Sequence, residues 1–184
     1  YLVGKPRVVL RFEQQRMPTR FDCSVDTDLA GCVRTRRSTN GGALLLGRHL
    51  IKAWSTTQAV TALSSGEAEY HGIVKGGSVL LGMMSLMSDL GLKIHGTVWT
   101  DSTTGKGIAS RRGLGKVRHI NTSFLWIQER VATNGFLLAK VKGEENVADL
   151  MTKHLDSKTA DRHMESLGIG SMAGRSTQQL HVAS

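Results

Sequence analysis

One long segment with helical spacing divides this chain into two halves. Ser64 and Glu67 match a capping box, in which a hydroxyl residue precedes a glutamate by three positions, and Gly91 supplies a stop. Between these limits apolar residues recur at intervals of three and four, so the sequence predicts an amphipathic helix from Ser64 to about Leu90. The elements on either side of this helix then indicate the class of fold.

Short apolar runs on both sides of the predicted helix indicate five strands. The first, from Phe21 to Val25, runs directly into Asp26. The second and third enclose a connection that contains Gly47, a pattern typical of a β-hairpin. The other predicted strands span 43–46, 50–54, 96–100 and 136–141, and further helices are expected from Ser102 to Ala109, over 124–131 and from Asn146 to about Leu155.

The ends of the chain differ from this patterned middle. Residues 1–20 are basic and weakly patterned, and the segment from Gly168 onward, rich in Gly, Ser and Gln, is predicted to be disordered. The sequence starts at Tyr1 rather than Met, which indicates a piece of a longer protein. No run approaches the roughly 18 apolar residues of a membrane helix, and no signal segment opens the chain.

The charge balance favours a polyanionic partner. Among 184 residues, Lys and Arg total 24 and Asp and Glu total 15, which gives a formal net charge of +9. Such a basic chain favours nucleic acid as its partner, with simple solubility as the alternative explanation. A hydrophobic content of 40% is that of a globular chain rather than a disordered one.

Four acids stand out against this basic background, because apolar runs carry each of them toward the interior. Asp26 and Asp101 follow predicted strands, whereas Glu69 and Asp149 lie in the first turns of predicted helices. In α/β sheets, ligands bind beyond the carboxyl ends of the strands. Three of the acids have a structural alternative: a turn residue for Asp26, a turn or cap shared with Ser102 for Asp101, and a partner of the helix macrodipole for Asp149.

Glu69 is the most informative of the four. Glu67 already has a local role in the capping box, whereas Glu69 has none. Steps of three and four residues from Glu69 follow the apolar stripe of the helix through Ile73, Gly76, Leu80, Met83 and Met87. An unpaired buried carboxylate is costly, so Glu69 is expected to meet a metal ion, an arginine or a wet cleft. Asp28 remains a competitor of Asp26, because alternate residues of a strand point the same way.

The motifs around these acids occur in a recognisable order. They are Ser24-Val-Asp-Thr-Asp-Leu-Ala-Gly31, Arg37-Ser-Thr-Asn-Gly41, Ala62-Leu-Ser-Ser-Gly-Glu-Ala-Glu-Tyr70, Trp99-Thr-Asp-Ser102, Lys116-Val-Arg-His-Ile120 and Glu145-Asn-Val-Ala-Asp-Leu-Met-Thr-Lys153. On these motifs the stretch from Phe21 to Leu155 resembles the ribonuclease H domain at the carboxyl end of copia-type retrotransposon polyproteins. The resemblance implies a ribonuclease H-like α/β fold, a five-stranded mixed sheet flanked by helices, which agrees with the order of predicted elements.

The resemblance also implies a specific chemistry. The four metal-binding acids of that family correspond to Asp26, Glu69, Asp101 and Asp149, which would act in catalysis by binding two Mg²⁺ ions, with Mn²⁺ as a substitute. The implied activity is endonucleolytic hydrolysis of the RNA strand of RNA–DNA hybrids during reverse transcription. The alternatives are a non-catalytic nucleic-acid-binding module on the same fold, an inactive transposon copy, and a different two-metal nuclease.

A division of the chain follows from the same resemblance. Residues 1–20 would end the preceding reverse transcriptase region, 21–155 would form the ribonuclease H domain, and 156–184 would hold a C-terminal helix and a flexible tail. The reverse transcriptase region of the same polyprotein is the expected protein partner, and no membrane is expected to take part. The expected location is intracellular, in a cytoplasmic transposon particle or in the nucleus.

Basic residues near the motifs are candidates for contacts with backbone phosphates. They are Arg36, Arg37, Arg111, Arg112, Lys116 and Arg118.

The sequence also departs from the family pattern in two places. The loop from Lys142 to Asn146 lacks the histidine that many ribonucleases H carry before the last acid, and Leu29 replaces a tryptophan. His119 lies in the basic loop instead, where a surface or packing role is expected.

Overall fold

Five strands form one mixed sheet in the computed structural model, which describes residues 7–115 and 119–172. The order across the sheet is β4-β3-β2-β5-β6. The strands are β2 Arg20–Asp28, β3 Thr39–Leu46, β4 His49–Thr57, β5 His95–Thr100 and β6 Leu137–Lys140. The predicted five-stranded mixed sheet, including the hairpin of β3 and β4, is confirmed.

The central strand, β2, sets the direction of the sheet. It is antiparallel to β3, with Asp26 opposite Gly41, and parallel to β5, with Ser24 beside Trp99. β4 is antiparallel to β3, and β6 is parallel to β5. Since β2 and β5 run in the same direction, Asp26 and Asp101 each follow the Ser24–Trp99 pair by two residues at one end of the sheet. This is the end at which open α/β folds bind ligands.

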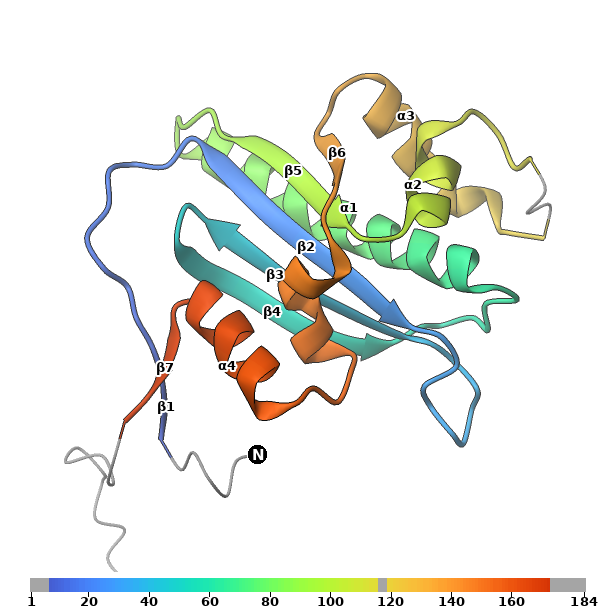
Figure 1. Ribbon diagram of the computed structural model, residues 1–184. Coiled ribbons are helices and arrows are strands. Elements are labelled where there is room, and N and C mark those ends of the chain that lie inside the picture. The colour runs from blue at the N-terminus through green and yellow to red at the C-terminus, as the bar shows by residue number, and fades with distance from the viewer. Residues whose placement is uncertain (1–6, 116–118, 173–184) are drawn as a thin grey trace, which may run out of the picture.

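Helices cover both faces of the sheet (Figure 1). The longest, α1 Ser65–Asp89, packs on β2, β3 and β5, with α2 Thr103–Ser110 against it and α3 Trp126–Ala132 against α2. The 3₁₀ helix η4 Val147–Met151 packs on β2, β3 and β4, and α4 Ser157–Ser166 packs on η4. The shorter 3₁₀ turns are η2 Thr122–Phe124 and η3 Gly143–Glu145.

Local signals set the limits of α1. The backbone N–H of Glu67 donates to the hydroxyl of Ser64 at 3.2 Å, and Gly91, just beyond the helix, has a φ of 77°, which favours glycine. The Glu67 carboxylate accepts from the N–H of Leu63 rather than from that of Ser64, so the reciprocal half of the capping box is shifted by one residue. The helix predicted from Ser64 to about Leu90 is confirmed.

The core between α1 and the sheet requires a close approach of the two layers. A Cβ atom at Gly76 would lie 2.3 Å from Cγ1 of Val25, so only glycine lets the helix pass this close to β2. Phe21, Tyr70 and Ile73 are fully buried in the same core. This packing fixes the first turns of α1 relative to β2.

Two predicted elements near the acids differ from the structure. β2 does not end at Asp26 but continues through Asp28, because Asp28 pairs with Thr39 at the start of β3. The helix expected from Asn146 to about Leu155 is the shorter 3₁₀ helix η4. Its geometry follows from the bond between the N–H of Asp149 and the carbonyl of Asn146, three residues earlier.

The termini also differ from the expectation. Val8–Leu10 forms β1, which is antiparallel to β7 Ile169–Ser171 in a separate two-stranded sheet. The disorder predicted from Gly168 onward is therefore wrong for β7, because β1 supplies the backbone partners that a Gly-rich segment lacks by itself. Residues 173–184 of the predicted tail lie outside the described residues.

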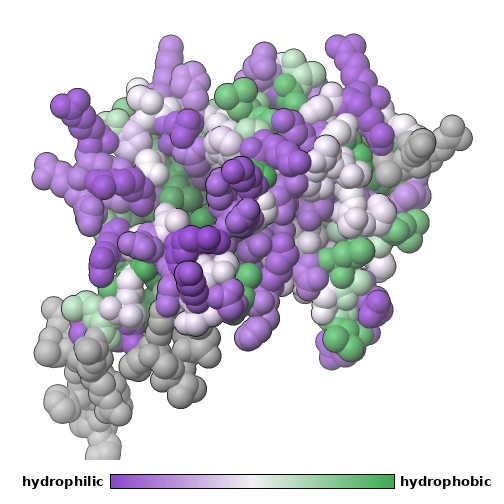
Figure 2. Space-filling model, viewed as in Figure 1, coloured by the Kyte–Doolittle hydropathy of each residue, from purple (hydrophilic) through white to green (hydrophobic). Residues whose placement is uncertain are grey.

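The surface is mostly hydrophilic on the face shown in Figure 2, where apolar side chains form small separate patches. Within residues 7–115 and 119–172, no helix is long and apolar enough to cross a membrane.

Candidate metal centre

Three of the four predicted acids meet at the carboxyl end of β2 and β5. Asp26, Glu69 and Asp101 each offer one carboxylate oxygen, and these oxygens lie within 4.8 Å of one another. Asp26 comes from within β2, Asp101 follows β5, and Glu69 lies in the first turns of α1. The packing of α1 on the sheet therefore brings together residues that are 32 or more positions apart in sequence.

Asp26 rather than its competitor Asp28 belongs to this group. The Asp26 side chain is 1% exposed and accepts a hydrogen bond from the hydroxyl of Thr152. Asp28 turns toward the following loop, where its carboxylate covers Gly31 so closely that a Cβ atom there would lie 1.8 Å from Oδ2.

Glu69 is held in place by the close approach of α2. A Cβ atom at Gly105 would lie 2.9 Å from Cβ of Glu69, so glycine at this position lets the start of α2 press against the acid. Oε2 of Glu69 is buried, and within the described part of the chain it has no hydrogen-bond partner. Burial and the nearby charges of Asp26 and Asp101 raise the pKa of Glu69 to about 8.

Asp149 lies beside this group but is paired with a lysine. Nζ of Lys153 lies 3.0 Å from Oδ1 of Asp149 and 3.1 Å from Oδ1 of Asp26. Burial raises the pKa of Asp149, although the hydrogen bond from Lys153 opposes the rise. Burial by itself would lower the pKa of Lys153, but the hydrogen bond to Asp149 and the charge of Asp26 raise it. The structure thus places three of the acids together and separates the fourth from them by an ammonium group.

Sequence reasoning missed the two residues that connect the acids, Thr152 and Lys153. The signal for Lys153 was its position four residues after Asp149, a spacing at which opposite charges pair on a helical turn. Asn146 was expected only at a helix start, yet it is fully buried, and its side chain donates to the carbonyl of Val25 at 3.0 Å. This bond ties η4 to β2 next to Asp26.

The donor set fits a divalent cation. Carboxylate oxygens are the ligands that Mg²⁺, Ca²⁺ and Mn²⁺ prefer in proteins. Burial and the charge of Asp26 raise the pKa of Asp101 as well, so the acids destabilise one another in the absence of a cation. The unpartnered Oε2 of Glu69 is an open ligand atom in the same place. Asp26, Glu69 and Asp101 could therefore bind a metal ion.

Glu67 has a different environment from Glu69 and is the more buried of the two. Its side chain is 4% exposed, and Oε2 accepts from the N–H of Leu63 at 2.9 Å and lies 2.7 Å from Nε2 of His119. Burial acts to raise the pKa of Glu67, but the hydrogen bonds from His119 and Leu63 outweigh it and the pKa is lowered. Glu69 has a buried Oε2, in agreement with its expected place at the head of the buried face of α1, and Glu67 adds a second buried carboxylate that has partners.

Proteins similar to this chain occur among retrotransposon polyproteins. It is 27% identical over 148 residues to the retrovirus-related Pol polyprotein from transposon TNT 1-94 of Nicotiana tabacum, a match that covers 79% of the chain and 11% of that polyprotein. It is 28% identical over 172 residues to the corresponding polyprotein from transposon RE1 of Arabidopsis thaliana, with 92% and 12% covered. Homologues of this chain are the Pol polyproteins of copia-like transposons. The chain spans about a tenth of the length of these relatives.

A comparison with solved structures gives ribonuclease H domains. LC11-RNase H1, isolated from compost by a metagenomic approach, aligns with 72% of this chain and 92% of its own length at 14% identity and a TM-score of 0.49. No family model matches the chain. The five-stranded mixed sheet with its helices is consistent with a ribonuclease H-like α/β fold, and the resemblance to copia-type Pol polyproteins predicted from the motifs is confirmed.

The predicted phosphate-contact residues that the structure describes fall in two loops of the fold. Arg36 and Arg37 are exposed in the loop between β2 and β3, beyond the acid end of the sheet, and Arg112 is exposed after α2. Arg111 is half-buried, and its guanidinium donates to the carbonyl of Leu114, so it holds its own loop together. Lys116 and Arg118 lie outside the described residues. The role of all six in binding stays a prediction.

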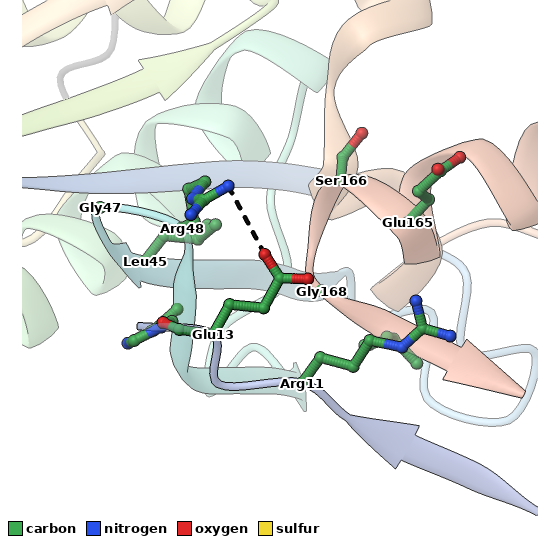
Figure 3. Close-up of a pocket in the computed structure, with 10 residues that line it drawn as sticks. Arg11, Glu13, Leu45, Gly47, Arg48, Glu165, Ser166 and Gly168 are labelled. Atoms are coloured by element: carbon green, nitrogen blue, oxygen red, sulfur yellow. Dashed lines mark hydrogen bonds and ion pairs between the residues drawn. The ribbon is translucent and has the colours of Figure 1, made fainter. Parts of the chain in front are cut away.

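A pocket of about 430 Å³ lies away from the acids, between the turn of β3 and β4, the segment after β1 and the connection of α4 to β7 (Figure 3). An ion pair of 3.6 Å between Arg48 and Glu13 crosses it. The turn lies at the amino end of β2, where Leu46 is opposite Phe21. Asp26 is ~16 Å further along that strand at the usual rise per residue, so this pocket is separate from the candidate metal centre.

Proposed function

We propose that this domain hydrolyses the RNA strand of RNA–DNA hybrids as part of a retrotransposon Pol polyprotein, with divalent cations held by its acids. The observation that carries the proposal is the meeting of Asp26, Glu69 and Asp101, with Oε2 of Glu69 buried and lacking a hydrogen-bond partner among the described residues. Three carboxylates from separate elements repel one another unless a cation joins them. Homology to copia-like Pol polyproteins supports ribonuclease H-like chemistry in a retrotransposon.

The acids would divide between two cations, Mg²⁺ by preference and Mn²⁺ as a substitute. Asp26, Glu69 and Asp101 would hold one, and Asp149 would contribute to the other once Lys153 moves aside. When bound, such cations activate a water for attack on the phosphodiester and stabilise charge on the departing 3′-oxygen. The chain itself orients Asp26 through the hydroxyl of Thr152, whereas Lys153 holds Asp26 and Asp149 only until a cation takes its place.

The proposed substrate follows from charge and from the chemistry of RNA. A net charge of +9, with Arg36, Arg37 and Arg112 exposed, supports binding to a polyanionic backbone. Phosphate contacts do not distinguish RNA from DNA, so selection of the RNA strand would depend on its 2′-hydroxyl groups. The reverse transcriptase region of the same polyprotein is the proposed protein partner, with residues 21–155 as the ribonuclease H domain.

Cleavage of a labelled RNA–DNA hybrid tests this proposal. The wild-type domain is expected to cut the RNA strand in Mg²⁺ and to be inactive in EDTA. Asp101→Asn is expected to lower the rate at least about a hundredfold, because it removes a charge from the site. Asp28→Asn is the matched control and is expected to cut at the wild-type rate. Equal activity of wild type and Asp101→Asn would remove Asp101 from the site, and no cutting by wild type would favour a non-catalytic module or an inactive copy.

A further inference from the structure

A cavity of about 490 Å³ adjoins Asp101 at the edge of the candidate metal centre. Its walls are Asp101 and the segment Lys140-Val-Lys-Gly143, which runs from the end of β6 into η3. Gly143 approaches the acid closely, since a Cβ atom there would lie 3.4 Å from Oδ2 of Asp101. Two lysines thus face one side of an acid that the proposed function assigns to a cation.

The parallel pairing of β5 and β6 explains this position. Thr100 is beside Lys140 in the register of the two strands, so Lys140 lies level with the residue before Asp101. Its ammonium is fixed there, because Nζ donates to Oγ1 of Thr103 at the start of α2, at a distance of 2.8 Å. Lys142 lies two residues further along and is exposed.

The charges around the cavity favour an anion. Asp101 is the one acid that lines it among the residues that the structure describes, and Glu144 and Glu145 in the following turn do not contribute to its walls. Burial and Asp26 raise the pKa of Asp101, and Lys140 is one of the cations that oppose the rise. When a divalent cation neutralises Asp101, the walls of the cavity keep the positive charges of Lys140 and Lys142.

We propose that Lys140 and Lys142 bind a backbone phosphodiester of the nucleic acid and hold it against Asp101. The proposal rests on the proposed function and adds a phosphate site that the sequence motifs did not indicate. Lysine is a suitable ligand, because its ammonium acts as a compact point charge toward phosphate oxygens. Lys142 also begins the loop that lacks the family histidine, so a cation of the chain adjoins the acids from that loop.

The test is the salt dependence of hybrid binding, measured by fluorescence anisotropy in Ca²⁺ so that the acids are neutralised. Lys140→Gln combined with Lys142→Gln is expected to weaken binding about tenfold near 0.1 M salt. The slope of log K against log salt should become shallower by about 1 to 2, since each lost phosphate contact is worth ~0.9. Lys52→Gln combined with Lys93→Gln is the control. It removes the same charge, from exposed positions on the opposite edge strand β4 and before the amino end of β5.

An unchanged slope in the Lys140/Lys142 variant, or an equal change in both double variants, would overturn the proposal. Mn²⁺ titration by calorimetry should show wild-type or tighter affinity in the Lys140/Lys142 variant, and weaker affinity would also overturn it, because the lysines would then act through the metal. Failure of the proposed function can be told apart from failure of the phosphate site. A wild-type domain that does not cut the hybrid would refute hydrolysis, while the difference in slope would still establish the phosphate site.

Discussion

Glu67 and Glu69 lie two residues apart at the start of α1, yet their surroundings are opposite. Glu67 is 3% exposed and accepts from the Leu63 backbone, with His119 at 2.7 Å. Glu69 is less buried, but it faces Asp26 and Asp101 and leaves Oε2 without a hydrogen-bond partner in the described chain. The pKa of Glu67 is lowered, whereas that of Glu69 is raised to about 8.

The difference shows that burial without compensation marks the acid suited to a ligand. Hydrogen bonds and opposite charges satisfy Glu67 within the fold, so its burial costs little. Burial without a hydrogen bond at Oε2 and the nearby charges of Asp26 and Asp101 disfavour the ionised form of Glu69, so the apo protein keeps an unfavourable interaction that a cation would relieve. One carboxylate serves stability and the other is available for chemistry.

The largest expected effect separates the two acids by activity. Glu69→Gln should lower the rate of hybrid cleavage in Mg²⁺ by at least about a hundredfold, because it removes a ligand charge at the site. Glu67→Gln should stay within about threefold of wild type, since its amide oxygen can still accept from Leu63. Cleavage assays at saturating hybrid measure the rates of both variants. Similar losses of rate in the two variants would contradict the assignment of Glu69, and not Glu67, to the metal centre.

The free energy of unfolding should depend more on Glu67 than on Glu69, the reverse of the order expected for activity. Glu67→Ala leaves the N–H of Leu63 and the ring of His119 without their acceptor and should lower the free energy of unfolding by about 1–3 kcal/mol. Glu69→Ala should leave the metal-free protein as stable as wild type or more so, because repulsion with Asp26 and Asp101 disappears. Urea unfolding in EDTA measures both values. A larger loss in Glu69→Ala would contradict the comparison.

The smallest expected effect is a shift of stability with pH. The pKa of Glu69 rises from 4.5 to about 8 on folding, so between these values the native state binds more protons than the unfolded state. The free energy of unfolding should therefore fall as pH increases through this window in EDTA, and Glu69→Gln should flatten the fall. Glu67 acts in the opposite direction, since its lowered pKa gives stability that is lost as pH falls. Thermal melts between pH 4 and 9 would refute the assignment if Glu69→Gln and wild type showed the same decline.

Much of the fold could be predicted because its signals are local. Ser64 and Gly91 bound α1 through a hydroxyl cap and a positive φ, and the connection at Gly47 closes the hairpin of β3 and β4. Two of the errors occurred where a strand depends on its partner strand, and the third is the 3₁₀ helix η4 in place of the longer helix expected from Asn146. β2 extends to Asp28 because β3 begins opposite it, and β7 forms because β1 pairs with it.

The sequence by itself determined the order of the five strands of the main sheet and placed the four acids in their separate contexts. Periodicity, caps and turns carry this information because they depend on neighbouring residues. Only the tertiary structure decided that Asp26, Glu69 and Asp101 meet while Lys153 lies between Asp26 and Asp149. It also decided that Glu67 is compensated by His119, 52 residues away. The physical reason is that charge and hydrogen bonding act through space, so the packing of α1, η4 and the sheet sets which acids are neutralised and which remain open to a cation.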